Sequence, residues 1–187
     1  MRVFFMAKVF IAIDGGNFYH KLRSKEVGLR NLLEFDYREF IKWLAKKNKV
    51  VDCCYYVGQI REEAGNTKSR NLKRDQDKLF TKLKKQGIRV QTGYILKSKN
   101  QYREKGVDVH IAVDVCMKAV RNEYDRLILV SSDTDLIPAI KEVKTLKKYV
   151  EYVGFDFSPS FAMIRFSDSR TLLKKEDLSL FKNIKKK

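Results

Sequence analysis

Acidic side chains at four separated positions of this sequence have the types and the setting that metal-assisted chemistry requires. Asp14, Asp108, Asp133 and Asp135 each follow an apolar run or open a predicted helix, and Asn17 comes soon after the first of them. Carboxylates that converge repel one another and are stable together when cations lie between them. Hard cations such as Mg²⁺ or Mn²⁺ prefer oxygen ligands, polarise phosphates and lower the pKa of bound water. The pattern therefore predicts hydrolysis of a phosphodiester at an aspartate cluster.

The same residues also have ordinary structural interpretations. Asp14 and Asp108 stand where each could cap a turn or a helix. Asp133 and Asp135 would lie in the first turn of a helix, where a carboxylate interacts favourably with the helix dipole. Asp108, however, falls on the apolar side of its predicted helix, where a carboxylate without a partner is costly. A functional role is therefore favoured for Asp108.

Asp114 has two interpretations that the sequence leaves open. It lies four residues before Lys118, so the two side chains could form an ion pair on a solvated helix face. Alternatively, Asp114 is a further candidate metal ligand beside Asp14, Asp108 and Asp133.

The elements that position these residues alternate between strand and helix. The apolar runs predict strands over residues 8–13, 50–57, 88–93, 126–130 and 149–153. Helices are expected over residues 18–24, 37–47, 68–86, 109–120, 133–146 and 160–167, and a loop or short hairpin over residues 94–105. This alternation predicts a three-layer α/β/α fold with a mostly parallel five-stranded sheet. Ligands of such sheets bind at the carboxyl ends of the strands, where the acidic residues would meet.

Composition limits the class of protein and of partner. The 187 residues suit one domain, which we expect over residues 1–178, followed by a basic C-terminal tail over residues 179–187. The 40 Lys and Arg against 23 Asp and Glu give a net charge of +17, which favours a nucleic acid as partner. No apolar run approaches the roughly 20 residues of a membrane helix. The three cysteines form no CxxC motif, which favours free thiols and a cytoplasmic location.

Four sequence stretches resemble one known family. They are VFIAIDGGNFY, KGVDVHIAVDVCMKA, LILVSSDTDLIPAIKEVK and SFAMIRFSDSRTLLKKEDL, in this order. Together they resemble the NYN domain, specifically its LabA-like branch, which is similar to PIN-domain nucleases. The resemblance runs from about Lys8 to about Leu178.

This resemblance implies a PIN-like, Rossmann-like fold and a ribonuclease site that uses Mg²⁺ or Mn²⁺. Carried over by position, the acidic residues of the family pattern correspond to Asp14, Asp108, Asp114, Asp133 and Asp135, and its asparagine to Asn17. No acidic position of the pattern is missing from this chain.

Basic and aromatic residues next to the predicted site suggest a surface for RNA, which we expect to be single-stranded. Phosphate neutralisation gives affinity that is independent of sequence, and aromatic faces stack on unpaired bases. The candidates are Arg61, Lys68, Arg70, Lys73, Arg74, Lys97, Lys99, Arg103, Lys105, Tyr94 and Tyr102. The alternative is a generally basic surface whose tyrosines lie on the core.

Two functions remain from these observations. The leading hypothesis is a metal-dependent ribonuclease that uses the aspartate cluster. The second is an RNA-binding regulatory module with the same acidic groove and no significant turnover. A dinucleotide-binding enzyme is disfavoured because no GxGxxG motif follows the first predicted strand.

Overall fold

A computed structural model describes residues 6–29, 31–98 and 101–182 of the chain, with the backbone alone for residues 95–98 and 101–104. Its centre is a seven-stranded sheet in the order β4-β3-β2-β1-β5-β6-β7. The strands are β1 (Lys8–Asp14), β2 (Lys49–Gly58), β3 (Arg89–Ser98), β4 (Gln101–Lys105), β5 (Arg126–Val130), β6 (Tyr149–Phe155) and β7 (Ser169–Leu173). All neighbouring strands are parallel except β3 and β4, which form an antiparallel hairpin.

The predicted α/β class is confirmed, and the predicted count of five strands is corrected to six parallel strands plus β4. The segment over residues 94–105 is the hairpin that we gave as one alternative. Strand β7 escaped prediction because its residues, SRTLL, are mostly polar or half-exposed and lack a continuous apolar run. An edge strand of this kind carries little periodicity for a sequence to display.

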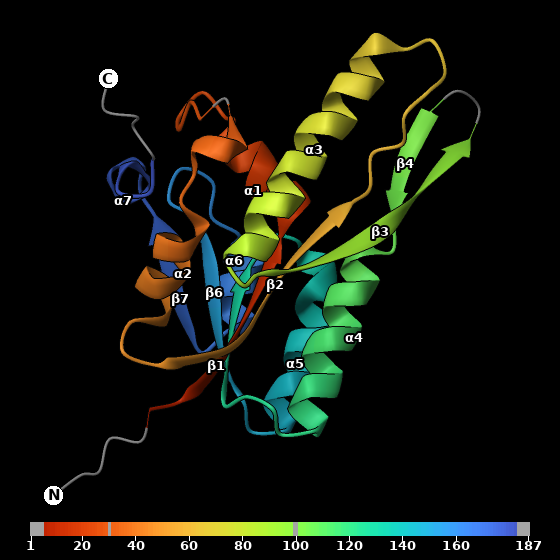
Figure 1. Cartoon of the computed structure of the whole chain (residues 1–187). Helices are drawn as coiled ribbons and strands as arrows, with labels where there is room; N and C mark the ends of the chain where they lie inside the picture. Colours follow the sequence, from red (N-terminus) through yellow and green to blue (C-terminus); the bar gives the residue numbers. More distant parts are fainter. Residues whose placement is uncertain (1–5, 30, 99–100, 183–187) are drawn as a thin grey trace, which may run out of the picture.

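Helices cover both faces of the sheet (Figure 1). One face carries α1 (Gly15–Leu22), α2 (Tyr37–Ala45) and α3 (Thr67–Lys85), and the other carries α4 (Val107–Val120), α5 (Ile137–Thr145) and α6 (Phe161–Phe166). Short 3₁₀ turns, η1 (Leu32–Glu34) and η2 (Thr134–Leu136), and the helix α7 (Lys175–Ser179) complete the chain. None of the described helices is both long and apolar enough to cross a membrane.

Strand β1 is buried on both faces, which explains its unbroken apolar sequence. Val9, Ile11 and Ile13 pack in the core on the α1–α3 side, while Phe10 and Ala12 pack under α4 and α5. Because successive side chains of a strand point to opposite faces, both sets must be apolar when helices cover both faces. Strand β1 pairs with β2 on one side and β5 on the other, so its carboxyl end lies at the middle of the sheet edge.

The C-terminal part of the described chain packs against this core. The ring of Phe181 lies 5.3 Å from that of Phe40, and its carbonyl accepts a hydrogen bond from the backbone amide of Asp36 at 2.7 Å. Phe181 is thus part of the packed core, and the division into a domain over residues 1–178 and a basic tail stays a prediction. Residues 183–187 of the expected basic tail lie outside the described part of the chain.

The two glycines that follow β1 make a stability prediction. A Cβ at Gly15 would lie 2.3 Å from the buried ring of Tyr55 and 2.7 Å from the carbonyl oxygen of Tyr56, whereas at Gly16 it would meet only Asp14, at 3.6 Å. We expect Gly15→Ala to lower the free energy of unfolding by about 1–3 kcal/mol through overpacking. Gly16→Ala is the matched control, with no loss or a gain of about 0.5–1 kcal/mol. Urea denaturation of both variants measures the difference, and equal stabilities would contradict this packing.

Candidate active site

The carboxyl ends of β1 and β5 lie side by side and bring two acidic segments together. Ile13 pairs with Val130, so Asp14 and Ser131 follow the paired strands at the same edge. Both side chains are buried. The Ser131 hydroxyl donates a hydrogen bond to Oδ2 of Asp14 at 2.7 Å and accepts one from the backbone amide of Asp133 at 3.1 Å. One serine oxygen therefore connects the first acidic residue with the acidic pair after β5.

Asn17 ties the same two segments together from the other side. Oδ1 of Asp14 accepts the backbone N–H of Asn17 at 3.0 Å, which caps α1. Oδ1 of Asn17 in turn accepts the backbone N–H of Ser132 at 3.3 Å. Asp14 is thus both a helix cap and a member of the acidic group, so the two interpretations of this residue do not exclude each other.

Asp108 reaches the group from the start of α4. The helix follows Gly106, whose left-handed backbone (φ 85°) forms the N-cap without a side-chain bond, so Asp108 is not the cap that the sequence allowed. Burial raises the pKa of the Asp108 carboxyl, and the charges of Asp133, Asp14 and Asp135 raise it further. The charges that act on Asp108 thus come from the acidic residues that follow β1 and β5.

The pKa of Asp14 is raised in the same way. Burial is the largest cause, and the charge of Asp133 adds to it, although the hydrogen bonds from Asn17 and Ser131 act in the opposite direction. Asp133 also caps η2, because its Oδ1 accepts the backbone N–H of Asp135 at 2.9 Å. The predicted residues Asp14, Asn17, Asp108, Asp133 and Asp135 thus lie at the same edge of the sheet.

This group supplies only oxygen atoms, which is the donor set that Mg²⁺ and Mn²⁺ prefer. A divalent cation would also relieve the repulsion that raises the pKa values of Asp14 and Asp108. As the side chains are placed, no three His, Cys, Asp or Glu residues within the described ranges gather tightly enough to count as a metal-binding group. The oxygen donors thus fit such an ion in their chemistry, while the choice of Asp14, Asp108 and Asp133 as its ligands stays a prediction.

Asp114 does not join the cluster. Its Oδ2 accepts hydrogen bonds from the Tyr56 hydroxyl at 2.7 Å and from the Arg89 guanidinium at 3.2 Å. The ion pair with Lys118 that the sequence allowed is not among the contacts of Lys118, which lies 3.2 Å from Asp52 and 2.9 Å from Glu123. The sequence could not show this, since Asp52 and Arg89 come from distant strands.

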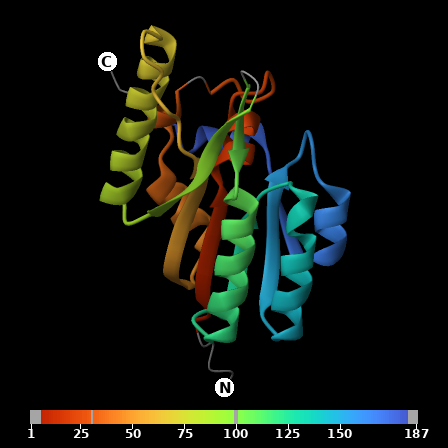
Figure 2. The ribbon, with the colours of Figure 1, turned by 90° about the vertical axis from the view of Figure 1, so that its right-hand side faces the viewer.

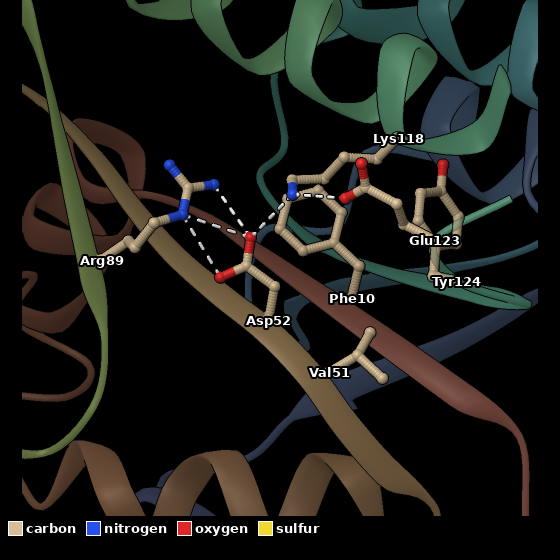
Figure 3. Close-up of a pocket in the computed structure, with 7 residues that line it drawn as sticks. All are labelled: Phe10, Val51, Asp52, Arg89, Lys118, Glu123 and Tyr124. Carbon is tan, nitrogen blue, oxygen red and sulfur yellow. Dashed lines mark hydrogen bonds and ion pairs between the residues drawn. The ribbon is translucent and has the colours of Figure 1, made fainter. Parts of the chain in front are cut away.

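These ion pairs line a pocket of about 310 Å³ beside the amino-terminal parts of β1, β2 and β3 (Figure 3). Its lining residues are Phe10, Val51, Asp52, Arg89, Lys118, Glu123 and Tyr124. Asp14 stands at the opposite end of β1. Burial alone would raise the pKa of Asp52, but Arg89 and Lys118 outweigh that effect and lower it. The charges in this pocket therefore balance one another, in contrast to those of the acidic cluster.

The predicted RNA-contacting residues lie on α3, on the loop before it and on the β3–β4 hairpin. In Figure 1 the start of α3 and the hairpin both lie at the upper end of the molecule. On α3, Arg70 pairs with Glu62, Lys73 with Asp77, and Arg74 with Asp75. Arg61 and Lys68 are exposed. Surface pairs of this kind are weak, so the α3 cations stay accessible to phosphates.

In the hairpin, Lys97 stands opposite Tyr102, and Tyr94 opposite Lys105. Arg103 pairs in register with Leu96, and Lys99 lies outside the described residues. Tyr94 and Lys105 are both exposed. Tyr94 therefore does not lie buried on the core, as the alternative interpretation of the tyrosines required.

Sequence reasoning did not assign a role to Ser131, Ser132 or Tyr152. Ser132 lies 3.0 Å from the Tyr152 hydroxyl, which also accepts the backbone N–H of Ser160 at 3.1 Å. The signal available was the pair of serines directly after a buried strand, since a buried hydroxyl needs a hydrogen-bond partner.

Two carboxylates with opposite electrostatic settings give a second prediction. The charged form of Asp108 opposes folding because its folded-state pKa is raised, so Asp108→Asn should keep or increase the free energy of unfolding at pH 7. The pKa of Asp52 is lowered, so Asp52→Asn should lose about 1–3 kcal/mol at pH 7.

The pH dependence checks the sign of each effect. The stabilisation by Asp52 is present above its unfolded pKa of about 3.9 and disappears as the pH falls through its lower folded pKa. The penalty from Asp108 disappears as the pH falls through its raised pKa. Urea denaturation from pH 7 to about pH 3 measures both. A loss of stability in Asp108→Asn as large as that in Asp52→Asn would contradict the assignment.

Comparison with known proteins agrees with this architecture. A protein of unknown function from Vibrio parahaemolyticus has a similar crystal structure, with a TM-score of 0.71 and 24% identity over 95% of this chain and 99% of that one. At that identity the likeness concerns the fold alone. A search of curated proteins gave no match. Residues 8–172 match the NYN domain, so the chain belongs to the NYN domain family.

Proposed function

We propose that this protein is a divalent-metal-dependent ribonuclease that hydrolyses RNA phosphodiester bonds at the cluster of Asp14, Asp108, Asp133 and Asp135. The observation that carries the proposal is the shared Ser131 hydroxyl, which holds the carboxylate of Asp14 next to the backbone of Asp133. Membership of the NYN family, related to PIN-like nucleases, supports ribonuclease chemistry at this place.

Mg²⁺ or Mn²⁺ would be held by Asp14, Asp108 and Asp133, and when bound would polarise the phosphate and lower the pKa of water. The chain itself supplies the arrangement. Ser131 fixes the Asp14 carboxylate, and the backbone amide of Asn17 fixes its second oxygen. Asp133 holds the backbone of Asp135 through the cap of η2. These hydrogen bonds restrict the rotation of the Asp14 and Asp133 side chains before any ligand binds.

Like charges gathered in this way are costly in a protein unless they serve a ligand. Burial is the largest cause of the raised pKa values of Asp14 and Asp108, neighbouring aspartates add to it, and no cation is among the main causes of either shift. By contrast, Asp52 and Asp114 are matched by Arg89. A chain of charge +17 has ample cations to neutralise the cluster, so this imbalance favours a site reserved for an ion.

The substrate in this proposal is an RNA strand guided by the basic residues of α3 and the hairpin. Phosphates repelled by the acidic cluster need cations nearby, and Arg61, Lys68 and Lys105 are exposed on that part of the surface. The three cysteines, all within the described residues, are free thiols, which fits a reducing compartment such as the cytoplasm.

The activity itself is the third prediction. Purified protein should cleave labelled single-stranded RNA in Mn²⁺ or Mg²⁺ and lose this activity in EDTA. Asp14→Asn should lower the cleavage rate by about 100-fold or more, because the variant loses a charge that holds the ion. Mn²⁺ should also raise the melting temperature of the native protein more than that of Asp14→Asn.

Asp114→Asn is the matched control, since it removes an aspartate of α4 that pairs with Arg89 and lies outside the cluster. Its cleavage rate per folded molecule should stay within about twofold of the native rate. Equal cleavage by Asp14→Asn and the native protein would contradict the proposed site. RNA binding without any metal-dependent product would favour the alternative, a regulatory RNA-binding module that uses the same groove.

The fourth prediction concerns the basic surface. Replacing Arg61 and Lys68 by Ala should weaken RNA binding and reduce the slope of log K against log salt by about 0.7 for each phosphate that the variant no longer neutralises. Lys47→Ala with Lys49→Ala is the control, because these exposed lysines lie at the amino end of β2. Fluorescence anisotropy over a series of salt concentrations measures the slopes. An equal weakening in both double variants would show diffuse attraction rather than a defined path.

A further inference from the structure

Three helices of one layer begin at the sheet edge that carries the acidic cluster. Helix α4 starts just before Asp108, η2 and α5 follow Asp133, and α6 starts after Ser160. In Figure 2 these helices stand side by side, with α6 on the outer side of α5 and the β3–β4 hairpin above the start of α4. The acidic residues thus lie between the hairpin and the start of α6.

An exposed aromatic ring lies on the hairpin side of this row. Tyr94 of β3 is 64% exposed, although most tyrosines near a core bury their rings. Its ring lies 6.2 Å from that of His110 on the first turns of α4. Gly106 has the left-handed backbone (φ 85°) from which α4 starts beside this ring, and a Cβ there would meet the ring at an ordinary contact distance of 3.6 Å. The ring is therefore held from one side and open to solvent on the other.

A second exposed ring lies at the opposite end of the row. Phe161, the first residue of α6, is 79% exposed, the highest value among the large apolar side chains of the described residues. Its neighbour Ser160 donates its backbone N–H to the Tyr152 hydroxyl, and that hydroxyl contacts Ser132 at 3.0 Å. Ser132 is bonded to Asn17, so a chain of hydrogen bonds links the start of α6 to the acidic cluster.

Gly154 makes this link possible. A Cβ at that position would lie 2.0 Å from the Tyr152 hydroxyl, so only glycine lets the tyrosine extend over it to the sheet edge. The position of Phe161 is therefore built into the fold around the site. An exposed phenylalanine contributes little to the core, and single exposed rings are common on surfaces. Two such rings on either side of one acidic cluster are a specific arrangement.

We propose that Tyr94 and Phe161 each stack on an unpaired base, so that a single RNA strand crosses the sheet edge with the phosphate to be cleaved between them. This inference rests on the proposed ribonuclease function and names its substrate as single-stranded RNA. Strands β3 and β6, which lead to the two rings, are four strand spacings apart, or about 19 Å. The RNA segment between the two stacked bases is therefore several nucleotides long. A duplex offers no unpaired base to either ring and is a poor substrate.

Fluorescence anisotropy with a labelled oligouridine in EDTA tests the inference without turnover. Phe161→Leu and Tyr94→Leu should each weaken binding about fivefold or more, the loss expected for one stacked base. Phe161→Trp and Tyr94→Phe, which keep a ring, should bind within about twofold of the native protein. Tyr149→Leu is the aromatic control, because Tyr149 is 43% exposed at the amino end of β6. Its affinity should not change.

The outcomes separate this inference from the proposed function. Ring-dependent binding in EDTA without cleavage in Mn²⁺ would support the stacking and contradict the ribonuclease. Cleavage by the native protein with unchanged binding in both leucine variants would contradict the stacking alone. Equal affinity for duplex and single-stranded RNA would also overturn it. A last contradicting result would come from sedimentation without RNA. If the native protein sediments as a dimer and Phe161→Leu as a monomer, and the variant keeps its RNA affinity, then the ring serves a protein contact.

Discussion

The parallel pairing of β1 with β5 is the constraint on which the candidate site depends. It places Asp14 and Ser131 at neighbouring strand ends, although 117 positions separate them in the sequence. The Ser131 hydroxyl then connects the Asp14 carboxylate to the backbone before η2. Because both strands are buried on both faces, their ends cannot shift relative to each other without disturbing two layers of the core. The rigidity of the sheet is thereby transmitted to the carboxylates.

The two ends of the sheet treat charge in opposite ways. Near the amino end, Asp52 is matched by Arg89 and Lys118, and the pairs continue to Glu123. At the carboxyl end, burial raises the pKa values of Asp14 and Asp108, the charges of neighbouring aspartates raise them further, and no cation is among the main causes of either shift. Natural proteins accept such a local cost at functional sites when the rest of the fold is stable enough to bear it. The contrast separates the ion-pair network near Asp52 from the acidic cluster, where the proposed function needs a cation.

Much of the fold and of the site could be predicted because the relevant signals are local. Buried parallel strands are continuous apolar runs, which a sequence displays directly. Asp14, Asp108 and Asp133 could be grouped since strand ends of a parallel sheet meet at one edge. The partner of Asp114 could not be predicted, because Arg89 and Tyr56 come from other strands. The setting of Phe161 was hidden for the same reason: its exposure and its link through Tyr152 exist only in three dimensions.

The central claim is that the four aspartates form a site for a divalent cation, and a crystal soaked in Mn²⁺ tests it most directly. The account predicts an anomalous peak at the carboxyl edge of the sheet, about 2.0–2.2 Å from carboxylate oxygens of Asp14 and at least one of Asp108 and Asp133. An ion bound only in the pocket of Asp52 and Glu123, or no ion near Asp14 at saturating Mn²⁺, would contradict it.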